Sequence, residues 1–281
     1  MTDSIIIVAS ISLALSLFVV CLRCYVRLKL VQSFGRDDLI IIVAMLVNIA
    51  FVIASILQAG AFEGWKAAKT PYEPRRALLL WWLSEILYLL ASGLVRISIA
   101  CSLLRIAIDR INKVTLYAIC ILNSLNTIAF LFFASFQCVP VSGFWKNRQD
   151  ASCVDATVVV KVTYLYSAIS SACDLALGIL PIALVWHLSM SWRYKKVALC
   201  CFLGAGSLAS AAVLIRIPFI EGYADSDLLN GTIIISVLSH VEVCTGIVAG
   251  SLPALRPLLR VSFKSTHRPS MSLARLSPAH A

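Results

Sequence analysis

The stretch Leu39–Gln58, LIIIVAMLVNIAFVIASILQ, runs for twenty residues without a charged side chain. An α-helix rises 1.5 Å per residue, so about 20 residues cross the roughly 30 Å hydrocarbon layer of a bilayer. A helix of a soluble domain seldom stays apolar on every face for this length. We therefore predict that Leu39–Gln58 spans a membrane as a helix, because a helix satisfies its own backbone hydrogen bonds in lipid.

Six further stretches have the same character, and seven spans leave no room for a soluble domain in 281 residues. The other predicted spans are Ser4–Leu22, Ala77–Ile99, Leu116–Ser135, Val162–Trp186, Val197–Ile217 and Ile233–Leu252. The composition agrees, since only 14% of the residues are charged, against about 25% in soluble domains. The predicted fold class is all-α: a polytopic seven-transmembrane-helix bundle over residues 1–255, followed by a basic, Ser- and Pro-rich tail over residues 256–281.

The net charge of +10 does not indicate nucleic acid, because the basic residues gather in alternating connections. The first, third and fifth connections and the tail contain Arg23, Arg27, Lys29, Arg36, Arg105, Arg110, Lys113, Arg193, Lys195, Lys196, Arg256, Arg260, Lys264, Arg268 and Arg275. The positive-inside rule then predicts an N-terminus outside and a cytoplasmic tail. The expected surroundings are a lipid bilayer, and no nucleic-acid partner is expected.

Two cysteines differ from the others by flanking a predicted outer loop. Cys138 and Cys153 bracket this loop on the side that is oxidising, which favours a disulfide with a Cα separation of about 4.4–6.8 Å. Two free thiols near helix ends are the alternative. The other cysteines lie mostly inside apolar spans and are expected to pack as small apolar side chains. No His-Glu-x-x-His motif is present, and neither a metal site nor a cofactor is predicted.

Several charged side chains fall inside the predicted spans, where their cost makes them candidates for function or for ion pairing. Glu85, Asp174, Arg216 and Glu242 are the candidate ligand-binding residues, lining a polar cavity inside the bundle. The alternative is a set of ion pairs between helices that fixes the bundle. We expect Asp174 and Glu242 to face the interior, with Arg216 or Arg96 paired to at least one carboxylate.

Five other residues have predicted structural roles. Arg96 lies toward the inner end of its span and can extend to the interface, which favours a structural role. Asp37 and Asp38 open the second helix, where acidic side chains cap the terminus and favour the helix dipole. Pro181 predicts a kink in the fifth helix, and Trp186 is expected to anchor that helix at the membrane interface.

Short motifs follow one another in order along the membrane part. They are Gly35-Arg36-Asp37-Asp38, Val95-Arg96-Ile97-Ser98, Leu104-Arg105-Ile106, Cys138-Val139-Pro140 with Trp145 and Cys153, Asp174, Leu180-Pro181-Ile182, Trp186-His187-Leu188, Lys195-Lys196, Arg216, Glu242, Gly246 and Leu252–Pro257. In this order the chain resembles the fungal seven-helix rhodopsin-domain family, which includes satratoxin-cluster-type integral membrane proteins. Arg96 stands where this family usually has Lys, and Leu104 where it often has Tyr.

The resemblance implies a receptor-like protein that binds a small, largely apolar molecule between its helices and meets a cytoplasmic signalling partner. A second hypothesis is a membrane enzyme or accessory protein of secondary metabolism, with Glu85, Asp174 or Glu242 as a buried acid. The sequence leaves enzyme activity open but favours the first hypothesis; transport ranks last because no internal repeat is evident. A retinal Schiff base needs a lysine on the last helix, and Ile233–Leu252 contains none.

Overall fold

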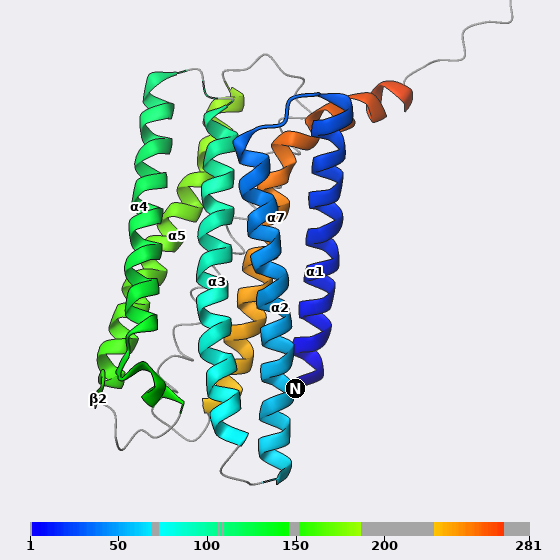
Figure 1. Cartoon of the computed structure of the whole chain (residues 1–281). Helices are drawn as coiled ribbons and strands as arrows, with labels where there is room; N and C mark the ends of the chain where they lie inside the picture. The colour runs from blue at the N-terminus through cyan, green and yellow to red at the C-terminus, as the bar shows by residue number, and fades with distance from the viewer. Residues whose placement is uncertain are drawn as a thin grey trace, which may run out of the picture.

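The computed structural model describes residues 2–68, 73–105, 107, 109–145, 152–186 and 228–266. Long helices run side by side along one common axis (Figure 1). Within the described residues, six helices are long and apolar enough to cross a membrane. The chain is therefore an all-α, multi-pass membrane protein. The predicted span Val197–Ile217 lies outside the described residues.

The described helices extend beyond most of the predicted spans. They are α1 (Thr2–Tyr25), which continues as the π-helical turn η1 (Val26–Leu30), α2 (Arg36–Ala68), α3 (Glu73–Leu104), α4 (Arg110–Ser135), α5 (Ala156–Trp186) and α7 (Leu228–Thr266). Hydropathy drops at the first charged residue, whereas a helix continues as long as its backbone hydrogen bonds from residue to residue are made. For this reason α7 passes residue 255, the predicted end of the membrane domain, and its last part turns away from the bundle (Figure 1).

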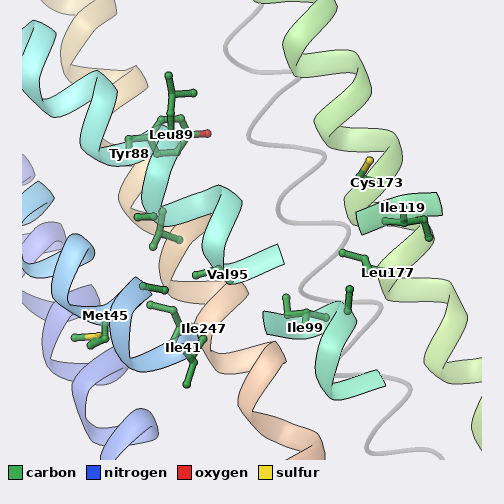
Figure 2. Packing of buried hydrophobic residues seen from close by; sticks show 14 of the residues in the cluster. Ile41, Met45, Tyr88, Leu89, Val95, Ile99, Ile119, Cys173, Leu177 and Ile247 are labelled. Atoms are coloured by element: carbon green, nitrogen blue, oxygen red, sulfur yellow. The ribbon is translucent and has the colours of Figure 1, made fainter. Parts of the chain in front are cut away.

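Helix α3 lies at the centre of the described bundle. It packs most extensively against α2, and it also contacts α4, α5 and α7, while α1 contacts α2 and α7. Figure 2 shows Val95 of α3, Ile247 of α7 and Ile41 of α2 meeting in this core. A helix with neighbours on every side buries its polar side chains as well as its apolar ones, which makes α3 the helix best placed to carry an internal site.

Two glycines on α7 let this helix approach α3 closely. A Cβ on Gly246 would lie 2.9 Å from Cγ1 of Val95, and one on Gly250 would lie 2.8 Å from Cγ1 of Ile99. The two glycines are four residues apart, so they share one face of the helix. This small-xxx-small spacing is the usual means of close helix contact in membranes.

A small disulfide-closed sheet connects α4 to α5. Strand β1 (Cys138–Val139) pairs antiparallel with β2 (Ser152–Cys153), and a 3-10 turn, η2 (Val141–Phe144), follows β1. The Cys138–Cys153 disulfide confirms the predicted bridge, with a Cα separation of 4.0 Å. This separation is shorter than predicted because the two cysteines face each other directly across the strands, where close pairs lie about 4.5 Å apart. The sheet lies at the same end of the bundle as the N-terminus (Figure 1).

Candidate functional site

Arg96, on the central helix α3, holds two carboxylates from two other helices. Its Nε donates to Oδ1 of Asp174 on α5 at 2.7 Å, and its Nη2 donates to Oδ2 of the same carboxylate at 2.9 Å. Nη2 also donates to Oε1 of Glu242 on α7 at 2.8 Å. The planar guanidinium matches the two oxygens of Asp174, and such forked pairs are among the stronger charge-assisted hydrogen bonds. We call Arg96, Asp174 and Glu242 the central cluster.

Tyr88 completes the hydrogen bonding of the central cluster. It lies eight residues before Arg96 on α3, and its hydroxyl donates to Oε2 of Glu242 at 2.8 Å. Each of the four carboxylate oxygens of Asp174 and Glu242 therefore accepts at least one hydrogen bond. Tyr88 also lies beside Phe51, whose ring stacks on His240 at a centroid distance of 4.3 Å.

Asp174 and Glu242 thus point into the bundle, and Arg96 is the partner of both. Arg96 could reach the membrane interface from its place in the sequence, but in the structure its side chain is only 4% exposed and is paired inside the bundle. Hydrogen bonds to two carboxylates hold the guanidinium inside the bundle more strongly than interfacial water would attract it.

Of the other two candidate ligand-binding residues, Glu85 lies apart from this cluster and Arg216 is not among the described residues. Glu85 is half-buried on α3, eleven residues or roughly 16 Å along the helix axis from Arg96, so the two cannot pair directly. His240 was not singled out from the sequence, although it lies two residues before Glu242 and is 1% exposed. A histidine so close to a carboxylate within an apolar span was the available signal.

A second ionic network lies where α1 ends and α2 begins. Arg23 is fully buried, and its Nε donates to Oδ1 of Asp38 at 2.8 Å while its Nη2 donates to Oδ2 of Asp37 at 2.8 Å. Its remaining nitrogen, Nη1, donates to the carbonyl oxygen of Gly250 on α7 at 2.6 Å. Ser102 of α3 bridges Arg23 and Asp37, with both distances at 3.0 Å. This junction network ties four helices together.

The two aspartates of the junction network do more than the predicted capping. The Asp38 carboxylate accepts the backbone N–H of Gly35 at 3.0 Å, which caps the start of α2. Asp37 also accepts from Arg27 at 3.4 Å and from Arg105 at 3.3 Å. Arg23 was missed as a partner because the sequence places it in a connection, whereas the helix continues past it. Its charge, one short connection before the acidic pair, was the signal.

The remaining motif residues lie on α5, which continues through Pro181 and ends at Trp186. Their side chains are outside the described part of the structure, so the predicted kink and interfacial anchor stay predictions. Among the described residues no group of His, Cys, Asp and Glu side chains is arranged to hold a metal ion.

Apolar helices around a buried ionic cluster define a polytopic helical membrane protein. Comparison with protein families narrows this class of protein to one family, because the family described as the fungal rhodopsin domain matches residues 22–261. The chain belongs to this family. The matched region contains both the central cluster and the junction network.

One curated protein is also similar. It is Fugralins biosynthesis cluster protein 2 of Gibberella zeae, which is 26% identical over 126 residues. The match spans 44% of this chain and 30% of the length of that protein. No solved structure matches the chain.

Proposed function

We propose that this protein binds a small, largely apolar molecule inside its helix bundle, next to the central cluster, and acts as a receptor-like membrane protein. The observation that carries the proposal is Arg96, buried among α3, α5 and α7 with one guanidinium nitrogen, Nη1, that makes no hydrogen bond within the described part of the chain. Ionised groups at membrane depth are costly, so their presence on three helices indicates a role beyond packing.

The chemistry of the cluster favours binding over acid–base catalysis. A general acid or base needs a carboxyl oxygen that can reach the reacting proton. Both oxygens of Asp174 and both of Glu242 already accept hydrogen bonds from Arg96 or Tyr88. Arg96, by contrast, keeps a donor for a ligand.

A second candidate function is a membrane-embedded enzyme or accessory protein of secondary-metabolite biosynthesis. The name of the similar Gibberella zeae protein supports this setting. Such an enzyme would use Asp174, whose side chain is 14% exposed and thus the most accessible of the cluster. Its activity would require Asp174 to leave Arg96 during the reaction.

Substitutions that keep shape and remove charge test the proposal. We expect Asp174→Asn and Glu242→Gln, expressed in a deletion strain, to reach the membrane but to fail to restore the phenotype of the strain, as read by metabolite profiling. Asp109→Asn makes the same chemical change at an exposed position outside the cluster and should restore it. Full restoration by both cluster variants would show that the cluster is structural. Substrate accumulating specifically in the Asp174→Asn strain would favour the enzyme.

The proposal includes an orientation, with the N-terminus outside and the tail of residues 256–281 in the cytoplasm, where a signalling partner would bind. The disulfide supports it, because oxidised cysteines belong to the outer side and this bridge lies at the N-terminal end of the bundle (Figure 1). A glycosylation acceptor added before residue 4 should be modified, whereas one added after residue 281 should not. The reverse pattern would overturn the orientation.

A further inference from the structure

Among the described residues, five buried polar atoms on α3, α4 and α5 make no hydrogen bond. One, Oγ of Ser84, lies twelve residues before Arg96 on α3; the other four are Nη1 of Arg96, Oδ1 of Asn123, Oγ1 of Thr127 and the hydroxyl of Tyr166. These last four residues are at least nine-tenths buried, with exposed fractions between 2% and 8%. Buried polar atoms are almost always satisfied, because an unsatisfied one keeps its full desolvation penalty. Several of them on neighbouring helices therefore indicate a site for a polar group.

The packing of the three helices places these four residues at adjoining positions, within about one helical turn of shared contacts. Asn123 and Thr127 of α4 both face Gly93 of α3, since the Asn123 Nδ2 reaches the Gly93 carbonyl at 3.5 Å and a Cβ on Gly93 would lie 2.9 Å from Thr127. Gly93 lies one helical turn before Arg96. Tyr166 of α5 stacks on Phe130 of α4 at 4.3 Å, one turn from Thr127, and lies on the same helix as Asp174, the partner of Arg96.

We propose that these residues bind the oxygen-bearing head group of the ligand, and that this head group is a neutral carbonyl or hydroxyl on an otherwise apolar molecule. The inference rests on the proposed function and specifies the ligand class. Arg96 Nη1 can only donate, so the head group must offer an acceptor. The hydroxyls of Thr127 and Tyr166 can donate or accept, and Asn123 Oδ1 accepts from a ligand hydroxyl.

A neutral group fits this site better than a carboxylate. The charge of Arg96 is already matched by two carboxylates at 2.7 and 2.8 Å. Nη1 therefore offers a directed hydrogen bond rather than an unmatched positive charge. A third anion at this place would meet Asp174 and Glu242 at short range in a low-dielectric environment, where like charges repel strongly.

Matched twelve-carbon probes test the head-group site in the full-length protein in lipid nanodiscs. Binding of dodecane, dodecan-2-one, dodecan-2-ol and dodecanoate is measured at equal mole fractions in the membrane, by thermal shift. We expect the ketone and the alcohol to bind the wild type roughly tenfold more tightly than dodecane, as a hydrogen bond from a charged donor implies. Dodecanoate should show no such gain.

Tyr166→Phe and Thr127→Val remove one hydroxyl each and should reduce the preference for the ketone over dodecane by half or more. Their unfolding temperatures without a probe should be unchanged or higher, because each loses an unsatisfied buried hydroxyl. Thr163→Val is the matched control, since its hydroxyl already donates to the Val159 carbonyl at 2.8 Å within α5. It should keep the wild-type preference.

Each outcome separates the head-group site from the proposed function. A ketone preference that persists in Tyr166→Phe and Thr127→Val would overturn the head-group site while leaving binding inside the bundle intact. Equal binding of all four probes, or tighter binding of dodecanoate, would also overturn it. The phenotypes of Asp174→Asn and Glu242→Gln report on the proposed function independently of these probes.

Discussion

The junction network and the central cluster both bury one arginine between two carboxylates, yet they differ in how completely the arginine is used. All three guanidinium nitrogens of Arg23 have partners on α2, α3 or α7. Arg96 has partners for two nitrogens and, among the residues that the structure describes, none for Nη1. Complete hydrogen bonding is what a fixed structural joint needs, whereas an unused donor is what a binding site needs. We therefore propose that the same residue types have different roles in the two regions.

The strongest test of this difference is Arg23→Gln. The change leaves Asp37 and Asp38 buried without their principal cation, and breaking such a pair costs about 3–5 kcal/mol of folding free energy. We expect poor accumulation in the membrane and a large fall in unfolding temperature. Arg27→Gln is the matched control, because Arg27 contacts the same aspartates only at 3.4 and 3.5 Å. A control as damaging as Arg23→Gln would show that the junction does not depend on Arg23.

Arg96→Met and Arg96→Lys should separate charge from geometry in the central cluster. Methionine leaves two carboxylates unpaired and should cost about 2–4 kcal/mol, less than Arg23→Gln because Asp174 is partly accessible. Lysine keeps the charge but loses the fork and should cost about 1–2 kcal/mol. Chemical unfolding in a defined detergent measures both. Equal losses for the two variants would mean that the forked geometry, and not the charge, dominates.

The close contact of α3 and α7 connects the two regions and can be tested at its glycines. Gly246→Ala and Gly250→Ala should each cost about 1–3 kcal/mol through overpacking against Val95 and Ile99. Gly60→Ala on α2 is the control, because a Cβ there meets nothing within 4 Å. This control should be neutral or stabilising by up to about 1 kcal/mol. If Gly246→Ala behaved like Gly60→Ala, the α3–α7 contact would be looser than described.

The smallest expected change in stability is the difference between replacing two serines of α3. Ser102→Ala removes hydrogen bonds to Arg23 and Asp37 and should cost about 1 kcal/mol. Ser84→Ala removes a hydroxyl that is also buried but makes no hydrogen bond among the described residues, so it should be neutral or slightly stabilising. Unfolding temperatures of the two variants give the comparison. A larger loss at Ser84 would contradict the assignment of satisfied and unsatisfied positions.

Sequence reasoning was most successful where the signal is local. Long uncharged runs predicted the multi-pass helices because a run of about 20 apolar residues satisfies all its backbone hydrogen bonds in lipid as a helix. Cys138 and Cys153 were paired correctly because they bracket one short loop. Residue boundaries were less accurate, since Arg23 ended the first predicted span although the helix continues past it to Tyr25.

The sequence determined by itself that the chain spans a membrane repeatedly, and that its charged residues at membrane depth need partners. Only the tertiary structure decided which partners they have. Arg23 meets aspartates 14 and 15 residues away across one short connection. Arg96 meets Asp174 and Glu242 at separations of 78 and 146 residues. The cost of an unpaired charge in lipid is a property of the residue. Its partner, however, depends on which helices pack together, and close packing at positions such as Gly246 decides which helices are neighbours.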